Sequence, residues 1–401
     1  MAAVDLNKLL NTFTFNGTLA PGKTFNTPNE NADINYIAGV DVNYATVSRS
    51  YAKEQSNGAI DTFGAGSTIS VGFYNPSEFT DAAKDNAFQA LQLWSGLVGL
   101  KFVYSADVTK AQFVFVHTGD TYQKNVLGTG TLYSVGRVDP ASRSYVDISR
   151  NGYIQIDNVT KQLDSNGSII LDKDDNPFFS YGDIGSYTSG KGYGIDTLVH
   201  EVGHLVGLGH AGNYNGYVAA STQQFNEFDV RTWSLMSYIS PTGTVPNTNT
   251  KPTTNETPFY LSNYPVQVDW QGETPYTPMG LDIIAAQRLV GPTSSSMFSG
   301  NNTFGFNSNI MYNALDGTQK KLSMYNFAPS TDGSTDTKPV VTLYDYGTNN
   351  TLDLSRFSDT SMVSLKDGSF STVAGLTNNI SSNGAPRSTA PSAVPATTPS
   401  S

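Results

Sequence analysis

The stretch from His200 to His210 decides how the rest of this 401-residue chain is interpreted. It reads HEVGHLVGLGH, so that His200 and His204 stand four residues apart. On an α-helix, side chains at this spacing share one face, and both imidazoles can reach one metal ion. Glu201 lies beside that face, where its carboxylate can contact a water on the metal without binding the metal itself. The stretch therefore predicts a metal-binding helix.

A third ligand requires the chain to turn back after this helix. Gly207 suits the turn, because glycine adopts the left-handed conformation that ends helices at no steric cost. His210 then returns to the metal, and three neutral imidazoles with an open position are a donor set of catalytic zinc. The alternative is a buried helix whose histidines bond to backbone carbonyls. A core helix has little use for two histidines and a glutamate within one turn, because apolar residues pack there at lower cost.

A second motif follows about two dozen residues later, at residues 234–238, and reads SLMSY. Together with the long histidine motif it resembles the metzincin peptidases, in which a methionine-containing turn underlies the zinc site. Within this clan, the residues of both motifs are most similar to those of the serralysin family, although Ala211 stands where family proteins usually have proline. The resemblance implies that Met236 supports the ligands from below. It also implies that Tyr238 coordinates zinc in the resting enzyme and swings to hydrogen-bond the reaction intermediate. Alone, a methionine in a polar turn usually fills core space.

Composition limits the partners of the chain. Only 14% of residues are charged and the formal net charge is −11, which argues against nucleic acid or an anionic membrane as partner. The chain has no cysteine, so disulfides, thiol catalysis and thiolate metal sites are excluded. No apolar run approaches the ~20 residues of a membrane span. We expect a monomer that acts on protein or peptide substrates.

The first residues lack the basic region and long apolar core of a signal peptide, which by itself indicates the cytoplasm. The resemblance implies secretion instead, since serralysins leave bacteria through an exporter that reads a C-terminal signal. The chain contains no Gly-Gly pair and hence none of the G-G-x-G-x-D repeats that wind the calcium-filled β-roll of the family. The usual exporter signal is not evident in residues 381–401. We expect an extracellular protein whose export route these departures leave open.

Hydrophobic periodicity predicts an α+β fold. Residues 68–73 alternate like a strand, a helix runs from an N-cap at Thr80 to about Gly96, and strands follow at 100–104 and 111–116. This order resembles the metzincin catalytic domain, in which an active-site helix packs under a twisted mixed sheet. In that clan an edge strand pairs with the substrate backbone, and we assign it to residues 130–135.

Further along, Thr277-Pro278 predicts the N-cap and first turn of a helix that Gly291-Pro292 ends. It resembles the closing helix of the serralysin catalytic domain. A smaller β-rich domain, similar to a truncated β-roll or sandwich, is expected to follow. The predicted regions are an N-terminal arm or short pro-segment at 1–35, the catalytic domain at 36–292, the β-rich domain at 293–380 and a disordered tail rich in Ser, Pro, Ala and Thr at 381–401.

Calcium is a second candidate cation. Residues 300–309 and 344–355 resemble two segments that share a calcium ion in the serralysin C-terminal domain, with Asp345, Gly347 and Gly300 at matching positions. Asn301 and Asn350 stand where acids are usual. Because fewer carboxylates bind a hard cation more weakly, a calcium site and an ordinary loop both stay open.

The sequence thus predicts a zinc-dependent endopeptidase with Glu201 as general base and Tyr238 as a second catalytic residue. One rival is a catalytically inactive, metzincin-shaped binding or adhesion protein, against which the complete ligand set argues. Others are a metal-dependent hydrolase of another bond and a zinc-stabilised structural domain, although structural zinc normally has four protein ligands. Among proteases an astacin-like enzyme is the alternative, and the SLMSY wording favours serralysin.

Overall fold

A computed structural model describes the parts of the chain that form its helices, sheets and core. The described residues are 53–54, 60–61, 66–73, 76, 79, 81–107, 111–117, 128–133, 137–138, 145–146, 151–156, 193–206, 208, 210–211, 229–241, 268–328, 338–384 and 396–397. Several sequence predictions fall elsewhere, among them the N-cap Thr80, the turn residue Gly207, the arm at 1–35 and most of the tail.

A five-stranded mixed sheet precedes the histidine motif, with the strand order β4-β3-β5-β9-β6. The first four of these strands run parallel to their neighbours, whereas β6 pairs antiparallel with β9 and lies at the edge. The predicted edge strand at 130–135 overlaps β6. The strands are β3 Thr68–Phe73, β4 Lys101–Tyr104, β5 Phe113–His117, β6 Gly128–Tyr133 and β9 Asn151–Ile156.

Helix α3, Asp81–Leu97, crosses from β3 to the parallel strand β4. Its apolar positions, spaced three and four residues apart as the sequence predicted, are buried in the core. Trp94 is fully buried and its indole N–H donates to the carbonyl of Val199 at 2.9 Å. Because a buried indole needs such a partner, this bond fixes α3 against the next helix, α4.

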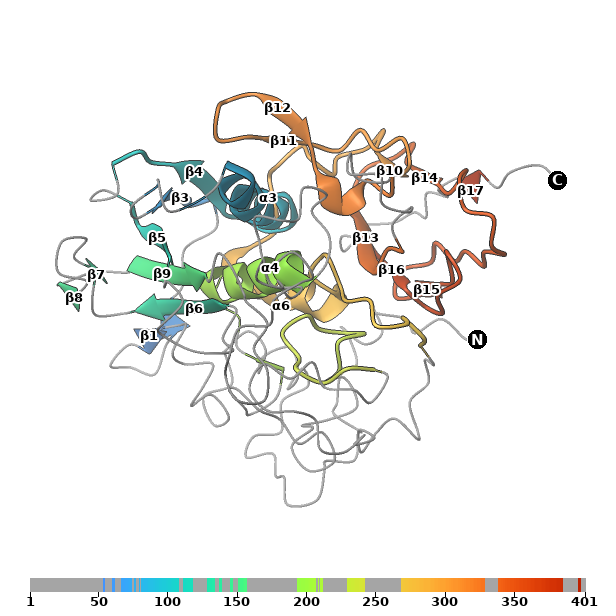
Figure 1. The fold of residues 1–401 in the computed structure, drawn as a ribbon, viewed down its shortest axis with the longest axis horizontal. Coiled ribbons are helices and arrows are strands. Elements are labelled where there is room, and N and C mark those ends of the chain that lie inside the picture. The colour runs from blue at the N-terminus through green and yellow to red at the C-terminus, as the bar shows by residue number, and fades with distance from the viewer. Residues whose placement is uncertain are drawn as a thin grey trace, which may run out of the picture.

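Helix α4, Tyr193–Val206, carries the first two histidines of the motif. The five-stranded sheet lies on one side of α4 and the small C-terminal sheets lie on the other (Figure 1). The apolar side chains of α4, among them Val199, Val202 and Leu205, belong to one core cluster with those of α3. Among the described residues, no helix combines the length and apolar character needed to cross a bilayer.

Helix α6, Gly280–Val290, begins later than the sequence predicted. Met279, rather than Thr277, is the residue before the first turn, and Asp282 accepts the Met279 backbone N–H at 2.8 Å. The hydroxyl of Thr277 instead accepts the backbone N–H of Thr342 at 2.8 Å. The Thr277 side chain, which the local sequence predicts to be the N-cap, therefore bonds to a distant strand instead of to the helix. The predicted end of the helix at Gly291 is confirmed.

The chain after α6 forms short strands in small sheets. β13 pairs parallel with β16, which pairs antiparallel with β15, and β10 pairs parallel with β14. The apolar core continues without a break from α3 and α4 into this region. The strands are β10 Thr303–Gly305, β11 Met311–Asn313, β12 Gln319–Lys321, β13 Val341–Asp345, β14 Thr351–Asp353, β15 Phe370–Ser371, β16 Ile380–Gly384 and β17 Ala396–Thr397, with a 3-10 turn at Ser323–Tyr325. Two further two-stranded pairs are β1 Lys53–Glu54 with β2 Ile60–Asp61, and β7 Arg137–Val138 with β8 Tyr145–Val146.

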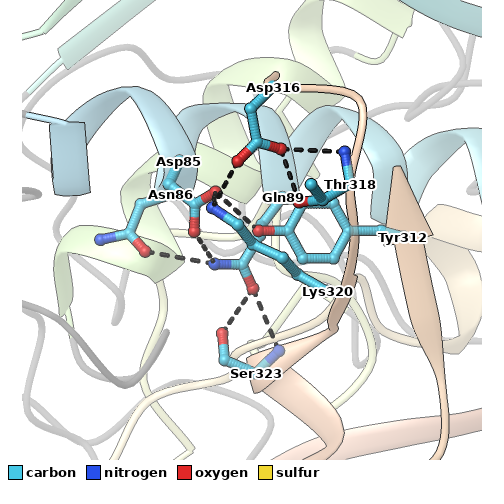
Figure 2. A network of polar contacts seen from close by, with 8 residues as sticks. All are labelled: Asp85, Asn86, Gln89, Tyr312, Asp316, Thr318, Lys320 and Ser323. Carbon is cyan, nitrogen blue, oxygen red and sulfur yellow. Dashed lines mark hydrogen bonds and ion pairs between the residues drawn. The ribbon is translucent and has the colours of Figure 1, made fainter. Parts of the chain in front are cut away.

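Polar contacts fasten the β11–β12 hairpin to α3 (Figure 2). The hydroxyl of Tyr312 donates to Asp85 at 2.8 Å, and burial raises the pKa of this phenol, which keeps it a donor. Gln89 accepts both the backbone N–H of Ser323, at 3.0 Å, and its hydroxyl, at 2.6 Å. The ion pair between Lys320 and Asp85 is partly exposed and adds little stability. The helix and a hairpin more than 200 residues away are thus joined directly.

Candidate metal centre

The three predicted metal ligands converge in the structure. His200 and His204 lie one turn apart on α4, and His210 follows after the helix ends. One ring nitrogen of each lies within 4.8 Å of the others, and all three side chains are buried. The Nε2 atom of His210 is 3.3 Å from that of His200 and 3.2 Å from that of His204. Within the described residues this is the one group of His, Cys, Asp or Glu side chains placed to hold a metal ion.

Backbone carbonyls fix which nitrogen of each ring is available. The Nδ1 atom of His200 lies 3.0 Å from the carbonyl oxygen of Leu235, and that of His204 lies 2.8 Å from the carbonyl of Leu208. A carbonyl can only accept a hydrogen bond, so each Nδ1 carries the proton and each Nε2 keeps a lone pair. Both Nε2 atoms face the Nε2 of His210, which has at most one proton to share between these two contacts. A cation among them resolves this arrangement, and the residues therefore fit a metal ion.

Burial also favours the neutral form of these rings. It lowers the pKa of His200 and of His204 well below the ordinary 6.5, and the neighbouring His210 lowers both further. Neutral imidazole is the form that binds metal. Glu201, next to His200 on the helix, is buried as well. Its carboxylate thus shares the low-dielectric surroundings of the three imidazoles.

The methionine turn closes one side of the histidine cluster. Met236 is fully buried, and its sulfur lies 2.8 Å from the point where a Cβ at Gly203 would stand. A side chain at position 203 would therefore push against the turn. The half-buried ring of Tyr238 lies 4.4 Å from that of His210 and 5.7 Å from that of His200, measured between centroids. Met236 therefore lies against α4, and Tyr238 lies beside two of the three histidines; their predicted roles as a support and as a second catalytic residue stay predictions.

A buried ion pair braces the segment that leads into this turn. Arg231 binds Asp196 in the first turn of α4, and the Arg231 backbone N–H donates to the carbonyl of Ile239 at 2.9 Å. Burial raises the pKa of Asp196 to about 6, although the Arg231 guanidinium opposes the shift. An unpaired charge is costly in such a place, so the pair couples α4 to the methionine turn.

Sequence reasoning missed two residues that shape the site. Gly203 was an unassigned position inside the motif, yet it is the glycine that lets Met236 approach the helix. Asp282 was counted only as part of a helix, yet it is buried and binds the methionine turn. An acid within the apolar run Leu281-Asp282-Ile283-Ile284 was the signal that could have found it. Gly207 lies outside the described residues.

The C-terminal calcium candidates have a different environment. Asp345 accepts the side-chain N–H of Asn302 and the backbone N–H of Gly347, each at 2.6 Å. Gly347 approaches Ser299 too closely to admit a Cβ, and Gly300 has a positive φ of 123°. Within the described part of the chain, Asp345 belongs to no group of three or more His, Cys, Asp or Glu side chains placed to hold a metal ion. Calcium therefore stays a prediction.

The geometry groups three buried histidines that could hold one metal ion on an α+β scaffold. The profile of the family described as "Peptidase M10 serralysin C terminal" matches residues 295–386. Metallopeptidase AprA of Pseudomonas marginalis is 29% identical over 82% of this chain and 57% of its own length. Serralysin of Proteus mirabilis is 28% identical over 77% of this chain and 51% of its own length. The chain is thus similar to serralysins over most of its length, and its residues 295–386 match the C-terminal model of that family.

The match with the family is partial in length. The chain spans about half the length of the curated relatives it matches. Metalloprotease AprA of Pseudomonas entomophila is 32% identical, over 48% of this chain and 34% of its own length. A solved structure of myroilysin aligns with 51% of this chain at 17% identity, but its TM-score of 0.23 is too low to bear on the fold.

Proposed function

We propose that this chain is a zinc-dependent endopeptidase that hydrolyses peptide bonds in extended protein segments. The observation that carries the proposal is the convergence of three buried imidazoles on one point, with Glu201 beside His200 on the helix. Relatives named as metallopeptidases and serralysins support the same activity. No cysteine is present to provide an alternative nucleophile or a thiolate ligand.

The proposed chemistry divides between the metal and the chain. His200, His204 and His210 would hold the zinc ion, which when bound would activate a water and polarise the scissile carbonyl. Glu201 is the general base, whose carboxylate accepts a proton from that water and delivers it to the leaving nitrogen. Met236 supports the ligands from below. The hydroxyl of Tyr238 donates a hydrogen bond to the oxygen on which negative charge develops.

We assign substrate binding to the edge strand β6, Gly128–Tyr133. An edge strand has unpaired N–H and C=O groups on one side, and an extended peptide can add to it as a further strand. Contacts between β6 and α4 place this edge beside the helix that carries His200 and His204. Backbone pairing at β6 then presents the substrate carbonyl to the metal centre, while side-chain pockets select the sequence.

The remaining assignments belong to the same proposal. The catalytic unit comprises residues 36–292, and the β-rich unit at 293–380 packs against it. The protein acts outside the cell, as a monomer, and its partners are protein substrates rather than nucleic acid or membrane. The net charge of −11 argues against nucleic acid and anionic membranes as partners.

The test is cleavage of casein by the purified full chain. We expect activity to disappear with a zinc chelator and to return when zinc is added back in equimolar amount. Glu201→Gln should keep the bound zinc and lose activity by about 10²–10⁴-fold, the usual contribution of a general base. Glu273→Gln is the matched control, because its half-buried carboxylate accepts the Tyr276 hydroxyl outside the proposed machinery.

Two results would contradict the proposal. Wild-type cleavage by the Glu201→Gln protein with its zinc in place would remove the base from the mechanism. Zinc binding without cleavage of casein or of any peptide in a random library would favour the binding-protein alternative.

A further inference from the structure

Asp282 is a fully buried carboxylate in the first turn of α6. Its Oδ1 atom accepts the Ser234 hydroxyl at 2.6 Å. Its Oδ2 atom accepts two backbone N–H groups, from Leu235 at 2.6 Å and from Met279 at 2.8 Å. Capping α6 requires only the bond to Met279. The other two bonds reach across to the methionine turn, which is 47 residues away in sequence.

Leu235 hydrogen-bonds both to Asp282 and to the proposed metal ligand His200. Leu235 donates its N–H to Asp282, and its carbonyl oxygen accepts the Nδ1–H of His200 at 3.0 Å. One peptide segment therefore connects the carboxylate on α6 to the imidazole on α4. Because the direct partner of His200 is a backbone carbonyl, no side-chain substitution can remove that bond. Asp282 is the side chain through which the carbonyl is positioned.

The neighbouring bonds spread the same constraint over the rest of the turn. Ser234, whose hydroxyl donates to Asp282, accepts the backbone N–H of Met236 at 3.1 Å. The Met236 carbonyl in turn accepts the N–H of Ala211 at 3.2 Å, directly after ligand His210. The turn thus touches the histidine cluster both through Leu235 and through the residue next to His210, and Asp282 is its anchor.

Burial of the Asp282 carboxylate is unfavourable, because the charged form loses its contact with water. Burial raises the pKa of Asp282 to about 6, although the bonds from Ser234, Leu235 and Met279 oppose the shift. An apolar residue at this helix position would avoid the cost but would leave the Leu235 N–H buried without a partner. The retained carboxylate points to a task in the turn beyond packing.

We propose that Asp282 is a positioning residue of the metal centre, which orients the imidazole of His200 through the Leu235 peptide. It touches neither the metal nor the substrate. This inference rests on the metal site of the proposed function but not on proteolysis. Partners that orient a ligating histidine typically change metal affinity by about 10–100-fold when they are removed.

The test compares the zinc affinity of the wild type and Asp282→Asn by competition with a chromophoric chelator. An amide keeps the shape but replaces one acceptor oxygen with a donor, which opposes either the Ser234 hydroxyl or the N–H groups of Leu235 and Met279. We expect about 10–100-fold weaker zinc binding. Asp353→Asn is the matched control: Asp353 is also buried, and accepts a side-chain amide from Asn307 and the backbone N–H of Ser355 within the C-terminal region. Its zinc affinity should equal that of the wild type.

A second readout separates positioning from mere stability. A metal that binds only the folded protein raises the unfolding temperature according to its affinity. If Asp282 served stability alone, Asp282→Asn would lower the unfolding temperatures of the metal-free and zinc-loaded proteins equally. We expect the zinc-induced increase itself to shrink in Asp282→Asn and to stay intact in Asp353→Asn.

Ser234→Ala provides a milder variant should Asp282→Asn fail to fold. It removes the bonds through the hydroxyl but leaves that between Leu235 and Asp282, so we expect a smaller loss of zinc affinity in the same direction. Wild-type zinc affinity in both variants, or in Ser234→Ala alone if the other does not fold, would overturn the inference. A wild-type chain that binds zinc but cleaves nothing would instead count against the proposed function and leave this comparison intact.

Discussion

The histidine cluster and the loop around Asp345 are both candidate metal sites, but their polar atoms have opposite surroundings. In the histidine cluster, protein acceptors take the Nδ1 protons of His200 and His204 and leave the Nε2 lone pairs facing inward. At Asp345, each carboxylate oxygen already accepts one hydrogen bond, from Asn302 or from Gly347, and within the described residues no group of three or more potential ligands includes it. Ligand-type residues are therefore insufficient to define a metal site. The grouping and the hydrogen-bond partners of those residues decide whether several lone pairs converge on one point that a cation could occupy.

Among the variants that compare the two candidate sites, removal of one histidine ligand should have the largest effect on zinc binding. We expect His210→Asn to bind no zinc at micromolar concentration, because two imidazoles alone do not complete the donor set of a catalytic zinc. Metal content measured after gel filtration checks this, with activity lost in parallel. The C-terminal variant Asp345→Asn should keep one zinc per chain. Equal zinc loss in the two variants would contradict the distinction between the sites.

A smaller loss is expected from Tyr238→Phe. The ring contacts with His200 and His210 would persist, whereas the hydroxyl that we propose as a donor to the developing charge would be gone. One hydrogen bond to a charged group contributes about 1.5–3 kcal/mol, which is roughly a tenfold to hundredfold loss in kcat. Steady-state cleavage of a fluorogenic peptide measures it, and zinc content should not change. A loss as large as that of Glu201→Gln would assign Tyr238 a more central role.

In the metal-free protein, the buried histidines should make the free energy of unfolding depend on pH. The pKa values of His200 and His204 lie well below 6.5 in the folded state, so the unfolded chain binds protons first as pH falls. Their contribution to stability is therefore unchanged above about pH 6.5 and is lost below it, by at most about 1.4 kcal/mol per pH unit for each ring. Asp196 and Asp282, with pKa values raised to about 6, act in the opposite direction.

The pH effect of one histidine is isolated by a variant. The free energy of unfolding by urea is measured for the metal-free wild type and for His204→Gln, each at pH 7.5 and at pH 5.5. Both proteins contain Asp196 and Asp282, so the contribution of these aspartates cancels when the two pH dependences are compared. We expect a shallower decline towards pH 5.5 in the variant. The same or a steeper decline would contradict a neutral, buried His204.

Calcium should produce the smallest effect. With Asp345 already bound by protein donors, we expect affinity no better than the weak range of roughly 10⁻⁴–10⁻³ M. At 10 mM calcium and a Kd of 1 mM, the added stability is only about 1.4 kcal/mol. Thermal unfolding with and without calcium measures this increment, and Asp345→Asn should abolish it. Submicromolar calcium binding would show that the Asn302 amide gives way to the ion.

Local spacing was enough to predict much of the catalytic scaffold. The four-residue interval of His200 and His204 placed them on one helix face, and alternating apolar residues predicted β3 over 68–73 as observed. Helix α3 could be predicted for the same reason, since its apolar positions repeat with helical period. These features depend on neighbours within one turn or one strand.

Features that depend on distant partners could not be predicted this way. Thr277 has the sequence properties of an N-cap, but Thr342 on β13 uses its hydroxyl, and α6 starts later. Gly203 matters because Met236 packs on it, and Asp282 matters because Leu235 and Ser234 bond to it. A single sequence gives the residue types but not these pairings, which arise only when α4, α6 and the methionine turn come together.

The most direct test of the account is a crystal structure of the full chain measured on both sides of the zinc absorption edge. The account predicts one anomalous peak per chain, about 2.0–2.1 Å from the Nε2 atoms of His200, His204 and His210. It predicts no zinc at Asp345. Zinc bound at Asp345 or elsewhere, with the three imidazoles empty in zinc-containing crystals, would contradict the central claim that this cluster is the metal centre.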